Sequence, residues 1–124
     1  MSEFDAYFAY YAERYMASDV DAVSTMYAVP MLALREGQAI HLADRAAARE
    51  HLTELTAGYV RSGAARADIA SLDVVPLGKS SVFATLHWHV RDTDGALLKD
   101  FHTTYHLLRV DGIWQILSYT NHDD

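Results

Sequence analysis

The spacing of the hydrophobic residues changes near residue 63, and this change constrains the fold more than any other feature of the sequence. Before it, apolar and aromatic residues recur every three or four positions, as on one face of an α-helix. After it, they alternate with polar residues, as in strands with one buried face. Helices followed by antiparallel strands predict an α+β domain with helices on one face of a curved sheet. The helical stripes are Phe4, Phe8, Tyr11 and Tyr15, then Ala48, Leu52, Leu55 and Tyr59, and the clearest alternation is Ser81–Arg91.

Capping residues and helix breakers set the expected bounds of these elements. Ser2 begins the first helix with a capping-box pattern, Asp19 begins a short second helix, and Asp44 begins a third. Pro30 ends the second helix, because the residue before a proline is pushed out of the helical region, and Gly63 can cap the third. The expected helices span about 2–17, 19–28 and 44–62, and the expected strands about 29–35, 39–42, 66–76, 81–91, 98–110 and 113–120.

Composition narrows the class of protein and its partners. A chain of 124 residues, 51% hydrophobic and 22% charged, fits a single domain over residues 1–124. A formal charge of -7 argues against nucleic acid or an anionic membrane as partner. Without cysteine there is neither a disulfide nor a thiolate site. The acidic N-terminal residues lack the basic region of a signal peptide, and no apolar run approaches the roughly 20 residues of a membrane span, so we expect a cytoplasmic protein.

Three segments carry a resemblance to a known family: YMASDVDAVSTMYAVP (residues 15–30), the helix begun by Asp44, and TTYHLLRVDGIWQIL (residues 103–117). They resemble the nuclear transport factor 2-like superfamily, which includes ketosteroid isomerase-like and SnoaL-like proteins. The resemblance spans nearly the whole chain and points to no specific member. It implies a cone-shaped α+β fold, with three N-terminal helices on a strongly curved, mostly antiparallel mixed sheet. It also implies a small-molecule ligand in the cone and a homodimer formed through the outer sheet face. Such a fold specifies no single reaction.

Strand parity predicts which side chains face the cone. If Asp111 and Gly112 form a two-residue turn, Val110 pairs with Ile113, and regular pairing then places Tyr105 opposite Ser118. In the family that the chain resembles, the Trp-x-Ile residues of the last strand pack inward. The expected pocket wall is therefore Thr103, Tyr105, Trp114 and Ser118, with Trp88 from the neighbouring strand and Tyr15 from the first helix. The expected outer face carries His87, His89, His102, His106, Leu117 and Tyr119.

The resemblance also suggests catalytic positions. Tyr11 stands eight residues before Asp19, the spacing of the isomerase tyrosine that donates to an oxyanion, and Tyr105 lies near the position of the second donor. Either could instead be a core tyrosine. Arg35 falls where the isomerases have their basic carboxylate. Because a guanidinium cannot accept a proton from carbon, we expect Arg35 to bind an anionic group or to lie on the surface. His41 is the remaining candidate base.

The four strand histidines allow two interpretations. Two imidazoles on one strand with a third across the ladder can make a zinc-type site. No carboxylate on these strands obviously completes such a set, however, and the outer sheet face is where the family usually dimerises. We therefore expect His87, His89, His102 and His106 to form a self-complementary interface, with no metal and no cofactor.

Three functions stay open at this point. The first is a small-molecule enzyme of the isomerase, dehydratase or cyclase type, acting on a small apolar or anionic carbonyl compound. The second is a non-catalytic binding domain in which Arg35 holds an anionic group. The third is an association module whose cone is filled by Trp88, Tyr105 and Trp114. The size of the cavity separates the third from the others.

Overall fold

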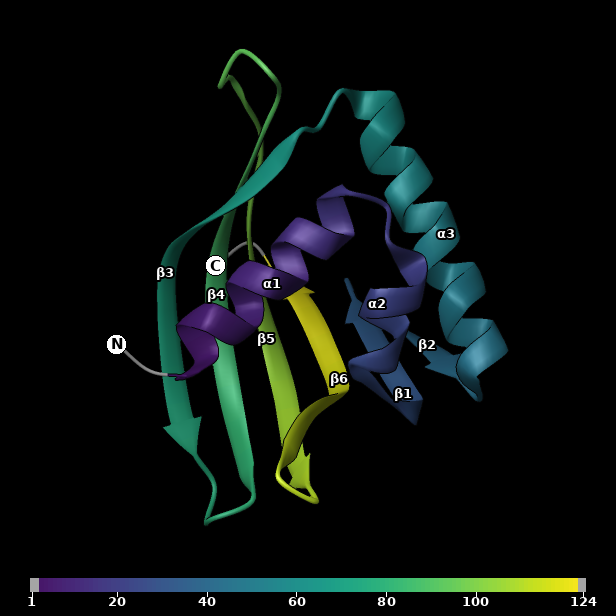
Figure 1. Ribbon diagram of the computed structural model, residues 1–124, viewed down its shortest axis with the longest axis vertical. Coiled ribbons are helices and arrows are strands. Elements are labelled where there is room, and N and C mark those ends of the chain that lie inside the picture. Colours follow the sequence, from purple (N-terminus) through teal and green to yellow (C-terminus); the bar gives the residue numbers. More distant parts are fainter. Residues whose placement is uncertain (1–2, 123–124) are drawn as a thin grey trace.

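Three helices precede most of the sheet in the computed structural model, which describes residues 3–122 (Figure 1). They are α1 (Glu3–Met16), α2 (Val20–Thr25) and α3 (Arg45–Ser62). The side chains of Asp19 and Asp44 accept hydrogen bonds from the backbone N–H groups of the first turns of α2 and α3, as N-caps do. Gly63 ends α3 with φ 84°, the left-handed conformation of a glycine C-cap. Ser2, the expected cap of α1, lies outside the described residues.

Within residues 3–122, six strands form one mixed, open sheet in the order β2-β1-β6-β5-β4-β3. Of the neighbouring pairs in this described part, β1 and β6 alone are parallel, and the others are antiparallel. The α+β class and the mostly antiparallel mixed sheet predicted from the sequence are thereby confirmed. The strands are β1 (Tyr27–Arg35), β2 (Gln38–Leu42), β3 (Arg66–Pro76), β4 (Ser81–Arg91), β5 (Leu97–Val110) and β6 (Ile113–His122).

The helices cover one face of the sheet. Figure 1 shows α1 lying across β3, β4 and β5, while α2 and α3 gather near β1 and β2. The stripe of α1 supplies Phe4, Phe8 and Tyr11 to the core, and the Phe8 ring lies 4.7 Å from that of Tyr105 on β5. No helix among residues 3–122 is both long and apolar enough to cross a membrane.

Alternating burial along β4 confirms the parity predicted for this strand. Leu86 and Trp88 are buried beneath the helices, whereas His87 and His89 are half-buried on the other side. In β5, Thr103, Tyr105 and Leu107 are likewise buried. We call the side of β4, β5 and β6 that the helices leave uncovered the outer face.

The turn between β5 and β6 has the expected form, but the pairing that follows it does not stay regular. Asp111 and Gly112 both have positive φ, as a type I′ turn requires, and Val110 pairs with Ile113. A β-bulge at Leu117 then shifts the register by one residue. Tyr105 consequently pairs with Tyr119 and His106 with Ser118, so the predicted pairing of Tyr105 with Ser118 is wrong.

Candidate functional site

A cavity of about 870 Å³ lies between the sheet and the helices α1 and α3. Its size falls within the range of small-molecule sites in proteins, roughly 300–1,000 Å³. Because aromatic rings from every side contribute to the wall, a mostly apolar ligand would contact aromatic surface over much of its area. The aromatic side chains of the wall include Tyr11, Tyr15, Tyr59, Trp88, Tyr105 and Tyr119.

The buried phenols of the cavity are held in hydrogen bonds. The Tyr11 and Tyr27 hydroxyls lie 2.8 Å apart, and the Trp88 indole Nε1–H donates to the Tyr105 hydroxyl at 3.2 Å. Burial raises the pKa of Tyr11 and Tyr105 well above that of a free phenol, so both remain neutral hydrogen-bond donors at physiological pH. The Tyr105 hydroxyl accepts from Trp88 and therefore still has its own proton to donate.

The cavity wall also holds the imidazole of His51, a residue that the sequence reasoning did not select. Its Nε2 lies 2.7 Å from the Tyr119 hydroxyl. Burial lowers the pKa of His51, and the nearby charge of Glu54 partly opposes this effect. The imidazole is therefore mainly neutral near pH 7, and it sits beside a hydroxyl in a wall of the cavity. His51 stands one turn after Ala48 and one turn before Leu55, so its place on the buried stripe of α3 was visible in the sequence.

Charged side chains gather where the cavity meets the solvent. Arg35 and Glu36 at the end of β1, Glu54 on α3 and Lys99 on β5 all line the cavity and are exposed. Among residues 3–122, no carboxylate lies within ion-pair distance of Arg35. The positive charge of Arg35 acts on the phenols of Tyr59 and Tyr119, where it opposes the rise in pKa caused by burial. The mouth of the cavity thus holds a cation that is free to pair with an anionic group.

The cavity brings together six of the nine residues selected from the sequence as catalytic or pocket residues. The other three, His41, Trp114 and Ser118, do not line the cavity. His41 points away from the cavity because its neighbour Ile40 faces inward, and Trp114 packs against Phe4 of α1. Ser118 lies beyond the bulge, opposite His106 on the outer face. The bulge also turns Tyr119, expected on the outer face, into the cavity. The residues that do line the cavity are Tyr11, Tyr15, Arg35, Trp88, Thr103 and Tyr105.

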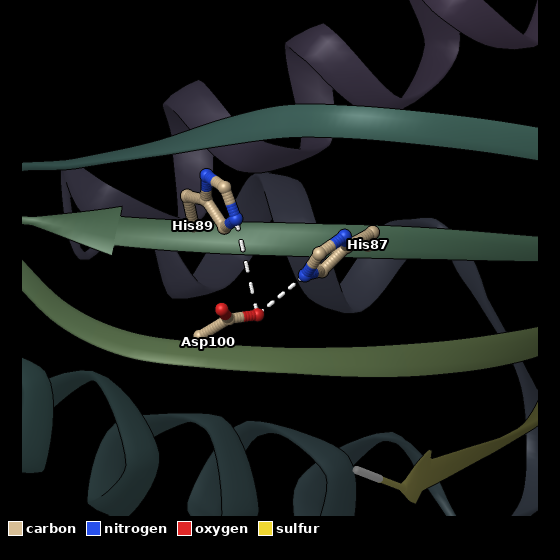
Figure 2. Close-up of side chains that lie close together, drawn as sticks. All are labelled: His87, His89 and Asp100. Carbon is tan, nitrogen blue, oxygen red and sulfur yellow. Dashed lines mark hydrogen bonds and ion pairs between the residues drawn. The ribbon is translucent and has the colours of Figure 1, made fainter. Parts of the chain in front are cut away.

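The outer face collects the histidines on β4 and β5, and Figure 2 shows those of β4, His87 and His89, beside Asp100 of β5. His87 and His102 are cross-strand partners whose rings stack 4.2 Å apart, and the ring of His89 lies 4.7 Å from that of His87. Asp100, the cross-strand partner of His89, projects among them and contacts Nε2 of His87. That hydrogen bond, with the imidazoles around it, holds the pKa of Asp100 below its usual value. The expectation that no carboxylate accompanies these histidines is therefore wrong.

The remaining outer-face candidates are spread along β5 and β6. His106 is bonded to Ser81 through its Nε2 at 2.8 Å and stands apart from the group around Asp100. Leu117 is the bulged residue of β6 and is half-buried. A role for these residues in a dimer contact stays a prediction.

Helices packed on a curved, open, mixed sheet, with a hollow between the two layers, define a class of α+β proteins rather than a single activity. The model of the family described as NTF2-like protein (DUF6841) matches residues 2–124. The chain belongs to this family, as the segments quoted from its sequence suggested. No curated protein matches the sequence.

Solved structures with the same fold share little sequence with this chain. Aln2 from a Streptomyces species is 19% identical, covers 98% of this chain and 89% of its own, and superposes with a TM-score of 0.75. An NTF2-like protein with a cystatin-like fold from Novosphingobium aromaticivorans is 17% identical over 92% of this chain and 75% of its own, with a TM-score of 0.72. A putative calcium/calmodulin-dependent protein kinase II association domain from Xanthomonas campestris is 16% identical over 98% and 86%, with a TM-score of 0.73. At these identities the likeness shows the fold alone.

Proposed function

We propose that this protein binds a small, largely apolar molecule in the cavity between the sheet and its helices. The observation that carries the proposal is the open volume of about 870 Å³. Trp88 and Tyr105 form part of the wall and leave the hollow open, and Trp114 lies outside it. An association module with a filled cone would show no such volume. The absence of cysteine is compatible with a reducing cytoplasm, which we keep as the proposed compartment.

The polar groups of the cavity indicate which ligands would fit. Neutral phenol donors in the interior suit a carbonyl oxygen, and Arg35 at the mouth suits a carboxylate or another anionic group. A compound with an apolar body, a carbonyl at its inner end and an anionic group at its outer end would use all three features. This is the substrate class that we propose.

Catalysis by this site would rest on His51 and Tyr119. A mainly neutral imidazole can take a proton from carbon, and a phenol 2.7 Å away can pass or share that proton. Tyr11 and Tyr105 would then donate to the oxygen on which negative charge develops. These steps fit an isomerase, dehydratase or cyclase. Without the proton transfer, the same arrangement describes a binding protein.

Ligand binding can be tested through Trp88, whose indole lies in the cavity wall. Titration with aromatic and alicyclic keto acids should change the tryptophan fluorescence, and the matching neutral ketones should bind more weakly. R35A should bind the acids up to about fivefold less tightly, since an exposed charge pair contributes up to about 1 kcal/mol. R61A is the matched control, because Arg61 is exposed on α3 and does not line the cavity. Saturable binding of the acids that is equally tight in the unmodified chain, R35A and R61A would show that Arg35 does not contact the ligand. If none of the probes binds, the proposed function of the cavity is refuted.

A homodimer through the outer face is a second candidate function. The helices leave this face uncovered, and Phe83 on it is 41% exposed, which is unusual for a large aromatic ring. The structural neighbour from Xanthomonas campestris carries an association domain in its name.

Sedimentation velocity tests the dimer. We expect a dimer for the unmodified chain and a monomer for F83K, because the contact would have to bury the charge of the new lysine. V60K is a matched control that should remain a dimer, since Val60 is an exposed apolar residue on α3, away from the outer face. A dimer that is insensitive to F83K would move the contact elsewhere on the molecule.

A further inference from the structure

The outer face holds a side-chain group that neither the cavity nor the proposed ligand uses. It consists of His87 and His89 on β4 and Asp100 on β5, which we call the His-His-Asp cluster (Figure 2). One ligand atom from each residue lies within 4.8 Å of the other two. We propose that this cluster binds a divalent first-row transition-metal ion, with zinc as the representative.

The backbone brings the three residues together without special loops. His87 and His89 are two positions apart on one strand, so both side chains project from the same side of the sheet. Asp100 is the direct cross-strand partner of His89, and antiparallel pairing places partner side chains on the same face. Because the positions lie within long paired strands, the ligand set is fixed by the sheet.

One of the three ligand-atom separations already matches that of an occupied site, and none exceeds 4.8 Å. Zinc lies about 2.0–2.2 Å from imidazole nitrogen and carboxylate oxygen, so two ligand atoms on one ion are roughly 3–4 Å apart. The Nε2 atom of His89 and the Oδ1 atom of Asp100 are 3.8 Å apart, within that range. The Oδ1 atom of Asp100 must move away from His87, and its exposed side chain leaves room to rotate. The remaining adjustment is a change of side-chain torsions on a fixed backbone.

The chemistry of the donors selects the kind of ion. Two imidazoles and one carboxylate suit zinc, cobalt or nickel, whereas magnesium and calcium prefer oxygen ligands alone. The guanidinium of Arg91 approaches Nδ1 of His89 at 3.5 Å but is also paired with Asp68 at 3.2 Å. Its charge is therefore partly balanced by a residue outside the cluster. Three protein ligands leave a fourth position for water, or for a donor from a second copy if the outer faces pair.

The experiment is a calorimetric titration of the tag-free, full-length chain with Zn²⁺, after chelator treatment and dialysis. Because the chain has seven histidines, stoichiometry alone is not sufficient, and variants must locate the ion. We expect saturable binding at a single site in the unmodified chain, and at least about tenfold weaker binding in D100N and in H89Q, since each lacks one ligand. H106Q and H41Q are matched controls, because both residues lie outside the cluster, and their affinity should be unchanged.

Two further measurements distinguish the loss of a metal ligand from the loss of the folded structure. Far-UV circular dichroism of D100N without metal should match that of the unmodified chain, because Asp100 is exposed. Co²⁺ bound in place of zinc should give visible absorption in the unmodified chain that D100N loses, and Mg²⁺ should give no binding heat. Zinc affinity that is the same in folded D100N, or that falls equally in H106Q, would overturn the proposal. Absence of saturable zinc binding in the unmodified chain would overturn it as well.

Discussion

Filling the cavity from its wall should change the stability of the fold little, whereas adding the same atoms elsewhere on the same face should destabilise it. Ala33 on β1 is buried and lines the cavity, between Ile40 and Tyr119 on the neighbouring strands. Ala84 on β4 is fully buried on the same side of the sheet but lies outside the cavity. A33L therefore places three additional carbons in an open space, whereas A84L places three additional carbons in a packed one.

The two environments imply different changes in the free energy of unfolding. Full burial of three carbons would stabilise the fold by about 2.4 kcal/mol, at about 0.8 kcal/mol for each. The cavity opens to solvent at its mouth, so only part of this gain is available, and A33L should change the stability by at most about 1 kcal/mol in either direction. In the close-packed core around Ala84, the additional volume forces neighbouring side chains to shift, which costs about 1–3 kcal/mol.

Urea unfolding followed by tryptophan fluorescence measures both values, and equal slopes with denaturant would show that the unfolded states are comparable. A33L should also weaken any ligand found by fluorescence titration, because its side chain occupies the ligand volume. A33L and A84L losing the same amount of stability would refute the reasoning, since the hollow beside Ala33 would then be filled in solution.

Three other changes test individual contacts. Because burial lowers the pKa of His51 in the folded state, the unfolded chain takes up the proton more readily. The free energy of unfolding should therefore fall as the pH drops below about 6.5. In H51Q, the free energy of unfolding should depend less on pH between about 7.5 and 5.5. Y119F removes the hydroxyl bonded to His51 and should cost about 0.5–1.5 kcal/mol in urea unfolding, with no change contradicting that bond. G112A places a Cβ at φ 79°, so it should cost about 1–2 kcal/mol of stability and lower the melting temperature. G58A lies inside α3, where a Cβ meets only ordinary contacts, so it should raise the melting temperature. A higher melting temperature for G112A than for G58A would contradict the assigned turn.

Most of the fold was predictable because its signals are local. The bounds predicted for β3 and β4 agree with the structure, since polar turns flank two runs of alternating residues. Asp44 and Gly63 mark the ends of α3 through hydrogen bonds made within a few residues. The bulge at Leu117 was not predictable in this way. Its position depends on how Tyr119 fits into the cavity and on how β6 pairs with β1, and both are long-range contacts.

The candidate site was predicted in part, because strand parity is a local signal whereas cross-strand register is not. Parity placed Trp88, Thr103 and Tyr105 on one side of the sheet, where the structure has them lining the cavity. His51 was missed because the family that the chain resembles has its base on a strand, although the helical stripe of α3 pointed to His51. Asp100 was missed because the pairing across the hairpin that follows Asp92 was not known in advance. Its spacing of two from His102 was the available signal, since both then share a face.

The bulge in β6 has a consequence for how related proteins could diverge. Beyond Leu117 the bulge decides which residue of β6 stands opposite Tyr105 and projects from the helix-covered side of the sheet. With regular pairing from the turn onward, that residue would be Ser118, and its small hydroxyl would replace the phenol of Tyr119 in the cavity wall. Relatives of this chain could therefore acquire a differently equipped binding chamber by gaining or losing this bulge.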